Sequence, residues 1–399
     1  MLIGIFSDTH LGFGSDERFD EAFQRFDETM ELFKEKNVDF ILHAGDLFDS
    51  AVPSQEVWLK TFDCFSKNIG DETRLAKKCF EKESSVTVRG IPFIAIHGTH
   101  EHRGKDFANA LDILEKSSFL VHLHAGYIEL EKNGERVFIH GLGGVPEKMA
   151  KQVLEKYSPK PIKDFCNLLL LHQSFKEFLP FDDESIASLS LSDLPKGFDL
   201  IIDGHLHWNN EQETEGKRFL LTGSTIFTQM KKLEGKKEKG VFLFDTKTKK
   251  IDFVPFKKQR KLFYSKIVFE NARPDEILER VNSKVSEFLL EKNEIKPLIR
   301  LKLTGMIAKG FGQKDIKFSF PMDKAIFSVS KEFSSEEFKR RIADLKELQA
   351  QKKSIVEFGI DLLEKNVAEA KLEKFDTRRI FSLLAEEELE KAESVLLKE

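Results

Sequence analysis

Short apolar runs bounded by turn residues recur through the first half of the chain. They are Leu2–Phe6, Val38–His43, Ile91–Ile96, Leu168–Leu171 and Leu200–Ile202. Continuous hydrophobicity over so few residues is typical of a strand that is buried on both faces. The pattern therefore predicts a series of buried strands.

The segment Asp16–Lys36, between the first two strands, has the spacing of a helix. Its apolar residues recur at alternating intervals of four and three: Phe19, Phe23, Phe26, Met30 and Phe33. A helix with this spacing has one apolar face, which packs against a neighbouring element. The order strand, helix, strand predicts an α/β fold.

From about Val137 the pattern changes to short strands separated by polar turns. The strands expected here are Val137–Gly141, Arg218–Thr222, Gly240–Phe244 and Ile251–Pro255. They predict a second sheet.

A smaller unit and a helical segment complete the chain. Leu262–Phe269, Pro274–Lys292 and Leu298–Thr304 predict a strand, a helix and a strand. From about Ser334 charged and apolar residues alternate at helical spacing, which predicts helices with little core of their own. We therefore expect an α/β domain over 1–258, a small α+β capping domain over 259–332 and a helical region over 333–399.

Composition limits the classes of function that fit this chain. Its 399 residues carry a net charge of only −5, so a nucleic-acid-binding surface has to be a local patch. The three cysteines, Cys64, Cys79 and Cys166, lie far apart, which indicates neither a disulfide framework nor a thiolate metal site. We expect a cytoplasmic protein without a membrane segment, because the first apolar run is too short to span a bilayer.

Each of the five predicted strands is followed by residues of types that commonly bind metals, with glycines among them. They are Asp8 and His10; Gly45, Asp46 and Asp49; Gly98, Thr99, His100 and Glu101; His172; and Gly204, His205 and His207. In open α/β sheets, reactive groups gather outside the carboxyl ends of the strands. We therefore expect these five loops to converge on one point.

The residue types favour a hydrolytic metal site. Residues two apart in extended backbone point to the same side, so Asp8 with His10, and His205 with His207, can each offer two groups together. Imidazole and carboxylate without thiolate favour manganese, iron or zinc, of which we expect manganese. Two cations about 3.5–4 Å apart need an anionic bridge, which Asp46 can supply. Such cations lower the pKa of a bound water and neutralise phosphate oxygens.

These motifs, in their order and spacing, resemble the calcineurin-like metallophosphoesterase family. Within it, the chain looks like a meiotic recombination eleven (SbcD-type) DNA double-strand-break repair nuclease, of an archaeal form. Weaker matches extend the resemblance over nearly the whole length: His172-Gln173, the segment 222–225, the segment 297–300 and Phe375-Asp376. The resemblance implies a β-sandwich flanked by helices.

The resemblance also implies a role for each motif residue. One Mn²⁺ would be held by Asp8, His10, Asp46 and His207, and a second by Asp46, Thr99, His172 and His205. His100 would be catalytic, either stabilising the transition state or protonating the leaving oxygen. The implied activity is exonuclease and single-strand endonuclease action on DNA ends.

Two positions depart from the family's pattern. The family has asparagine at Thr99, where the amide oxygen reaches the second metal. Threonine is shorter, so we expect weaker occupancy of that site. Asp49 stands where many relatives have histidine and others aspartate, and we expect it to support the site without binding the metal.

The resemblance implies partners as well as DNA. The basic residues Lys257, Lys258, Arg260 and Lys261 are candidate phosphate contacts, and the stretch Lys231–Lys239 is a candidate diluted by acidic residues. Apolar positions on the C-terminal helices would bind a coiled-coil ATPase of the SbcC or Rad-fifty type. They are Ile355, Phe358, Leu362, Leu363, Phe381, Leu383, Leu384, Leu389, Leu396 and Leu397. A homodimer is expected through Gln55–Phe65 and Phe107–Lys116.

Two alternatives stay open at this point. One is a phosphodiesterase or phosphatase of the same superfamily that acts on a smaller substrate, which leaves the chain after residue 258 unexplained. The other is a scaffold that tethers DNA ends, with a metal site impaired by Thr99.

Overall fold

The computed structural model describes residues 1–104, 107–179 and 188–334, and then 359–360, 363–364, 367 and 376–385. The chain forms two compact units. The first comprises 1–264, 288–300 and 321–328, and the second comprises 265–287, 301–320 and 329–399. The domain boundaries predicted at residues 258 and 332 stay predictions.

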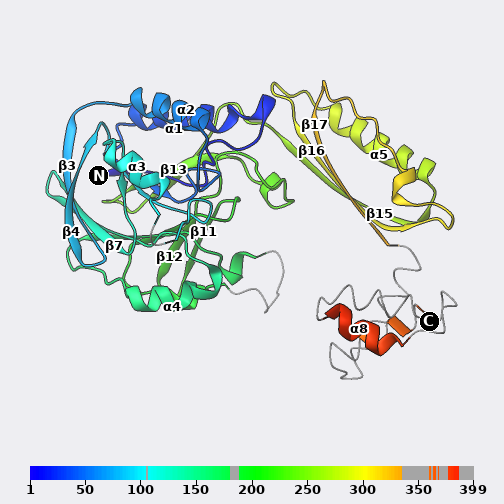
Figure 1. The fold of residues 1–399 in the computed structure, drawn as a ribbon. Coiled ribbons are helices and arrows are strands. Elements are labelled where there is room, and N and C mark those ends of the chain that lie inside the picture. The colour runs from blue at the N-terminus through cyan, green and yellow to red at the C-terminus, as the bar shows by residue number, and fades with distance from the viewer. Residues whose placement is uncertain are drawn as a thin grey trace. The chain divides into compact units, whose positions relative to one another are not determined.

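A six-stranded sheet forms one half of the first unit (Figure 1). Its strands are, in order, β14 (Ile251–Pro255), β13 (Gly240–Asp245), β1 (Leu2–Phe6), β2 (Phe40–Ala44), β5 (Phe93–Ile96) and β6 (Val121–His122). The run from β1 to β6 is parallel, while β13 pairs antiparallel with both of its neighbours. The first three predicted strands therefore lie side by side.

An eight-stranded sheet forms the other half. Its strands are, in order, β11 (Asn210–Thr214), β12 (Lys217–Leu221), β10 (Leu200–Asp203), β9 (Cys166–Leu171), β8 (Glu135–Gly141), β7 (Gly126–Lys132), β3 (Glu72–Cys79) and β4 (Lys82–Arg89). The strands β8, β9, β10 and β12 run parallel.

The second sheet predicted from the sequence exists, but two of its strands were assigned wrongly. β13 and β14 belong to the six-stranded sheet, because β13 pairs with β1 from Leu2↔Asp245 to Ile5↔Phe242. The apolar pattern of a strand indicates which of its faces are buried, but it does not indicate which strand lies beside it. The pattern therefore could not distinguish the two sheets. The hairpin of β3 and β4 was missed, since its residues are largely exposed.

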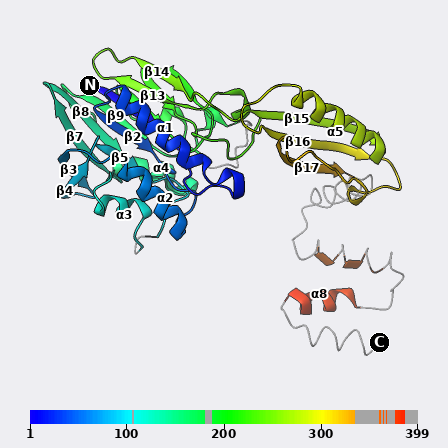
Figure 2. The same cartoon turned by 90° about the horizontal axis from the view of Figure 1, so that it is seen from above.

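The two sheets pack face to face and helices cover their outer faces (Figures 1 and 2). Ile3, Ile94 and Phe244 of one sheet share a buried cluster with Ile139 and Leu170 of the other. The outer face of the six-stranded sheet packs against α1 (Glu21–Glu35), α2 (Gln55–Ser66) and α3 (Ala110–Lys116). The outer face of the eight-stranded sheet packs against α4 (Glu147–Tyr157). The predicted β-sandwich flanked by helices is confirmed.

A three-stranded sheet of order β15 (Leu262–Ala272), β16 (Leu298–Ile307) and β17 (Ile326–Ser334) follows. The helix α5 (Pro274–Leu289) buries Ile277, Val281 and Val285, spaced four residues apart. The strand, helix and strand predicted here are present, and β17 is an additional strand.

Short 3-10 turns join several of these elements. They are η1 (Asp16–Arg18), η2 (Lys176–Phe178), η3 (Leu191–Asp193), η4 (Glu234–Lys236) and η5 (Gln313–Asp315). In the C-terminal region α8 (Thr377–Ala385) is helical. Within the described residues, no helix has the length and apolar character needed to cross a bilayer.

Phe33 joins α1 to the first strand, and its removal tests this packing. The side chain is fully buried, and a Cβ added at Gly4 would lie 2.7 Å from its ring. We expect Phe33→Ala to lower the free energy of unfolding by about 3–5 kcal/mol, because the cavity cannot close fully. Urea unfolding measures the loss. Glu31→Ala, at an exposed position of the same helix, should change stability by less than about 0.5 kcal/mol, and equal losses for the two variants would contradict this account.

Candidate functional site

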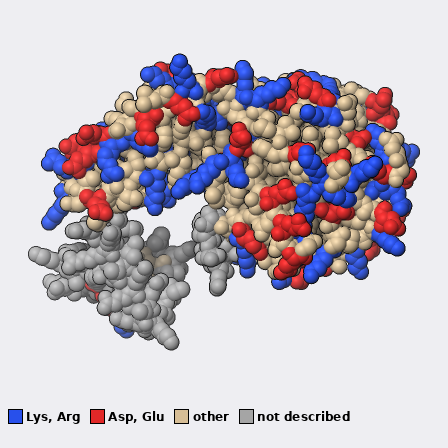
Figure 3. All heavy atoms as spheres, turned by 180° about the vertical axis from the view of Figure 1, so that it is seen from behind, with Lys and Arg blue, Asp and Glu red and all other residues tan. Residues whose placement is uncertain are grey.

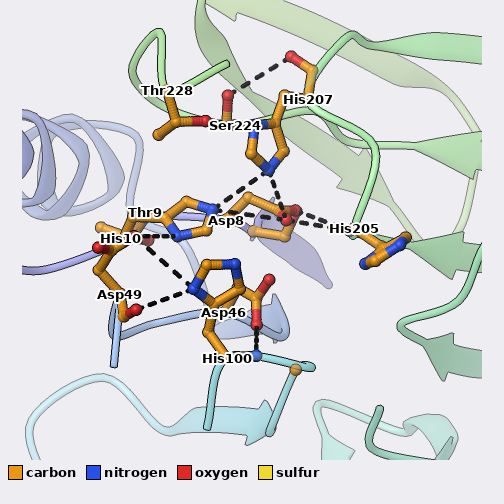
Figure 4. A network of polar contacts seen from close by, with 12 residues as sticks. Asp8, Thr9, His10, Asp46, Asp49, His100, His205, His207, Ser224 and Thr228 are labelled. Atoms are coloured by element: carbon orange, nitrogen blue, oxygen red, sulfur yellow. Dashed lines mark hydrogen bonds and ion pairs between the residues drawn. The ribbon is translucent and has the colours of Figure 1, made fainter. Parts of the chain in front are cut away.

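The predicted site residues meet where loops from both sheets come together (Figure 4). The loop after β1 contacts the loop after β2, since the backbone N–H of Asp8 donates to the carbonyl of Gly45 at 2.9 Å. The loop after β10 joins them through the N–H of His205, which donates to Asp8 Oδ1 at 3.0 Å. The ligands come from two facing sheets, and the five loops converge as expected.

The backbone at the site is not extended, which corrects the argument for paired side chains. Four residues have positive φ: Asp8 (49°), His10 (51°), Asp46 (55°) and His205 (73°). Left-handed backbone is costly for residues other than glycine and is found mainly where surrounding contacts enforce it. Asp8 and His10 still face one centre, but His205 and His207 turn to different groups.

The first ligand group is formed by Asp8, His10 and His207. His10 Nε2 lies 3.2 Å from His207 Nε2, and Asp8 Oδ1 lies 4.0 Å from the first nitrogen and 3.7 Å from the second. All three side chains are almost completely buried. The group therefore places two imidazole nitrogens and one carboxylate oxygen around a common point.

The second ligand group is formed by Asp46, His172 and His205. His172 Nε2 lies 3.0 Å from Asp46 Oδ2, and the carbonyl of Ala44 accepts a hydrogen bond from His172 Nδ1 at 2.7 Å. The backbone thus fixes the tautomer of His172 with Nε2 toward the site. Glu147 Oε1 lies 3.5 Å from His205 Nε2.

His100 and Asp49 lie at the open side of the site (Figure 4). The side chain of His100 is 42% exposed, whereas that of His10, against which its ring packs at a centroid distance of 4.8 Å, is 1% exposed. His100 Nδ1 donates to the carbonyl of Asp49 at 2.8 Å. Asp49 Oδ1 lies 3.1 Å from His10 Nδ1. The aspartate thus holds the far nitrogen of His10.

Glu101 ties the loop after β5 to the loop after β2. Its buried carboxylate accepts hydrogen bonds from the backbone N–H groups of Asp46 (3.1 Å), Phe48 (2.7 Å) and Gly98 (2.6 Å). The loops approach so closely that a Cβ at Gly98 would lie 2.1 Å from Asp46 Oδ1. The glycine after β5 is therefore required by the position of Asp46.

Burial and charge shift the pKa values of the site in opposite directions. Burial raises the pKa of Asp8 to about 6. Burial alone would raise the pKa of Asp46, but the charge of His172 lowers it below its usual range. Burial alone would lower the pKa of His172, but Asp46 and Asp8 outweigh it and raise the value to about 10. Burial and the charge of His172 lower the pKa of His205 to about 3.

Thr99 lies between Gly98 and His100 in the same loop and is half-buried. The N–H of the next residue, His100, donates to Asp46 Oδ1 at 2.9 Å. The loop that carries Thr99 is thus anchored at the second group, and the effect of threonine on metal occupancy stays a prediction.

Several residues of the site were not found by sequence reasoning. Asp203 ends β10, is buried, and accepts a hydrogen bond from the N–H of Gln173 at 3.0 Å. Its place after a predicted strand was a usable signal. Glu147 begins α4, and Thr228 contacts His207 Nδ1 through its hydroxyl oxygen. Neither of these two had a signal, because each reaches the site from a distant part of the chain.

The basic residues proposed to contact DNA differ in exposure. The Arg260 side chain is 8% exposed and its Nε lies 3.3 Å from Glu21 Oε1. Lys258 is exposed, and Lys261 is half-exposed and pairs with Glu291. On the face drawn in Figure 3, basic and acidic side chains are interspersed. A DNA contact by Lys257, Lys258, Arg260 or Lys261 stays a prediction.

The six remaining described histidines belong neither to the two ligand groups nor to the cluster of His10, Asp49 and His100. They are His43, His97, His102, His122, His124 and His140. His43 Nε2 lies 2.9 Å from the hydroxyl of Thr9, and His97 Nδ1 lies 2.9 Å from His122 Nε2. These contacts satisfy buried nitrogens within the fold.

Most of the C-terminal positions predicted to bind a partner lie outside the described residues. These are Ile355, Phe358, Leu362, Leu389, Leu396 and Leu397, together with Phe375 of the weak motif. Among the described positions, Phe381, Leu383 and Leu384 lie in α8, where Leu384 is 46% exposed.

Several known double-strand break repair proteins are similar to this chain. The DNA double-strand break repair protein Mre11 of Thermoplasma acidophilum is 27% identical over 346 residues, which cover 82% of this chain and 82% of that protein. The double-strand break repair protein MRE11 of Arabidopsis thaliana is 27% identical, over 83% of this chain and 54% of that protein. Mre11 of Sulfurisphaera tokodaii is 31% identical, over 60% of this chain and 58% of that protein. The chain spans little more than half the length of the last two.

The family described as calcineurin-like phosphoesterase matches residues 1–209, which is more than half of the 399 residues. The match contains both ligand groups and His100. The resemblance drawn from the motifs is confirmed, and the chain is a member of the calcineurin-like phosphoesterase family.

Proposed function

We propose that this chain is a metal-dependent nuclease that processes DNA ends in double-strand break repair. The observation that carries the proposal is that both ligand groups lie where the loops of the two sheets meet. The exposed ring of His100 lies beside them. The choice of DNA as substrate is supported by the relatives, whose names describe DNA double-strand break repair proteins.

The donor atoms fit divalent cations. Two imidazoles whose Nε2 atoms face each other at 3.2 Å, with a carboxylate oxygen within 4.0 Å, can present three lone pairs to one point when both Nε2 atoms are unprotonated. We infer that Asp8, His10 and His207 bind one Mn²⁺ and that Thr99, His172 and His205 bind a second. Asp46, which belongs to the second group, would serve both ions. The donor set contains no thiolate, which fits manganese, iron or zinc in a hydrolytic site, and of these we propose manganese.

When bound, such cations lower the pKa of a water and neutralise the charge on phosphate oxygens. The protein's own side chains orient the ligands and face the substrate. His172 and His10 keep their Nε2 atoms toward the site because Ala44 and Asp49 hold their Nδ1 atoms. His100 directs Nδ1 to the carbonyl of Asp49, so its other nitrogen is available to a phosphate or a leaving oxygen at the open side.

We further propose that the chain works as a homodimer with a coiled-coil ATPase bound to its C-terminal helices. Support for the dimer comes from exposed apolar side chains in and beside the two predicted segments, namely Leu59 (66% exposed), Phe107 (64%) and Ile113 (44%). Exposed apolar side chains that form a contiguous patch are typical of contact surfaces. The proposal of an ATPase partner rests on the resemblance of the sequence to the nuclease family.

Variants in the loop after β5 test the nuclease proposal. With Mn²⁺, we expect His100→Ala to lower the rate of DNA end degradation by about 10²–10⁴-fold, since it removes a group that contacts the reacting phosphate, while metal binding is retained. Thr99→Asn should raise the rate by filling the second site. Labelled single- and double-stranded DNA and a small phosphodiester are the substrates. His102→Ala, at an exposed histidine two residues further on, is the matched control and should be fully active.

The same assay separates the alternatives. Cleavage of the small phosphodiester alone would favour a phosphodiesterase with a smaller substrate. Turnover that requires Thr99→Asn would favour a DNA-tethering scaffold. Equal loss of activity in His100→Ala and His102→Ala would overturn the catalytic role of His100.

Metal affinity should depend on pH. Without metal, the pKa of His172 is raised to about 10, so His172 holds a proton at pH 7 that a cation must displace, whereas Asp8, with its pKa raised to about 6, holds a proton mainly below pH 6. Affinity for Mn²⁺ should therefore rise with pH, by about tenfold per pH unit for each proton released. Calorimetric titration between pH 6 and pH 8, in buffers of different ionisation enthalpy, counts the released protons. Binding that is independent of pH would contradict these pKa shifts.

A further inference from the structure

The hydroxyl of Thr228 lies against the one side of His207 that faces away from the ligand group (Figure 4). His207 Nε2 points to His10 Nε2 at 3.2 Å and to Asp8 Oδ1 at 3.7 Å, while Nδ1 contacts Thr228 Oγ1. We propose that Thr228 is a positioning residue that sets the tautomer and orientation of His207. This inference rests on the proposed function, since it concerns the same metal site.

Two other imidazoles of the site are held in the same way as His207, which explains how Thr228 can fix its ring. The Nδ1 atom of His10 is held by Asp49, and that of His172 by the carbonyl of Ala44. An imidazole that binds a metal through one nitrogen usually donates its other N–H to an oxygen, which fixes the ring and increases its basicity. Thr228 supplies that oxygen for His207. It is therefore the third member of a set in which each ring has a different kind of acceptor.

The segment that carries Thr228 is held on both sides. The buried side chain of Arg18 donates to the carbonyl of Phe227 at 2.6 Å. The N–H of Thr228 donates to Glu234 Oε1 at 3.2 Å. A hydroxyl on a segment fixed at two neighbouring backbone atoms has little freedom, so it can impose an orientation on its partner.

A buried ion pair connects this segment to the backbone of His207 itself. Lys239 Nζ lies 3.0 Å from Glu234 Oε1, and their side chains are 5% and 1% exposed. The same ammonium group donates to the carbonyl of His207 at 2.7 Å and to Ser224 Oγ at 2.7 Å. Lys239, from a stretch considered for phosphate contacts, thus supports the ligand loop from inside the protein.

Thr228 is the member of this arrangement that can be changed without leaving a buried charge unpaired. Removal of one partner of a buried ion pair such as Lys239 and Glu234 strongly destabilises a protein, so those variants would not distinguish positioning from folding. Thr228→Val keeps the shape and removes the hydroxyl, and Thr228→Ser restores an oxygen. Thr225→Val is the matched control, because the hydroxyl of Thr225 is buried in the same segment and has no hydrogen-bond partner among the described residues.

Calorimetric titration of the full chain with Mn²⁺ tests the proposal. We expect Thr228→Val to weaken one binding event by about 10–100-fold and to leave the event assigned to His172 and His205 unchanged. Thr228→Ser and Thr225→Val should titrate as the wild type does. A melting temperature close to that of the wild type shows that each variant is folded. Equal affinities for Thr228→Val and Thr225→Val would overturn the role of Thr228.

A second measurement needs no metal and no DNA. Nitrogen NMR of histidine-labelled protein distinguishes the two tautomers, and the signal of His207 is identified by its loss in His207→Gln. We expect His207 to carry its proton on Nδ1 in the wild type and in Thr228→Ser, and to lose that preference in Thr228→Val. An unchanged tautomer in Thr228→Val would refute the proposal even if the chain cuts DNA, whereas absence of DNA cleavage with the expected tautomers would refute the nuclease alone.

Discussion

The buried carboxylate of Asp46, between two facing sheets, is the constraint on which the rest of this site depends. A carboxylate without solvent is stable only when charges and hydrogen bonds compensate for its lost hydration. Here Oδ2 lies 3.0 Å from His172 Nε2 and Oδ1 accepts the N–H of His100. These contacts draw the loops after β5 and β9 toward the loop after β2. The left-handed backbone at Asp46 and the glycine at position 98 follow from the same requirement.

The two carboxylates of the site, Asp8 and Asp46, repel each other. Asp8 and Asp46 each destabilise the ionised form of the other, and His172 is a buried cation that both carboxylates stabilise. The protein therefore holds two carboxylates close together, and a divalent ion can compensate their charge. Such arrangements are more typical of functional sites than of structural ion pairs.

The sequence located the chemistry better than it located the architecture. Apolar runs followed by Asp, His and Gly identified the loops, since both features are local. The partner of each strand depends on contacts across the sandwich, so β13 and β14 were placed in the wrong sheet. The positive φ at Asp8 and His205 also could not be read from spacing, because tertiary contacts enforce it. Thr228 lies in no motif and Lys239 was considered only as a phosphate contact, so their roles appear only when distant segments come together.

The position of the ligands on two sheets has a consequence for the whole domain. Asp8, His10 and Asp46 belong to loops of one sheet, and His172, His205 and His207 to loops of the other. An ion bound by both sets acts as a cross-link between the halves of the sandwich, and it binds the unfolded chain far less well. The folded state then gains stability with the logarithm of the free ion concentration. Depletion of the ion would thus loosen the scaffold itself, and resistance to proteases would follow the supply of metal.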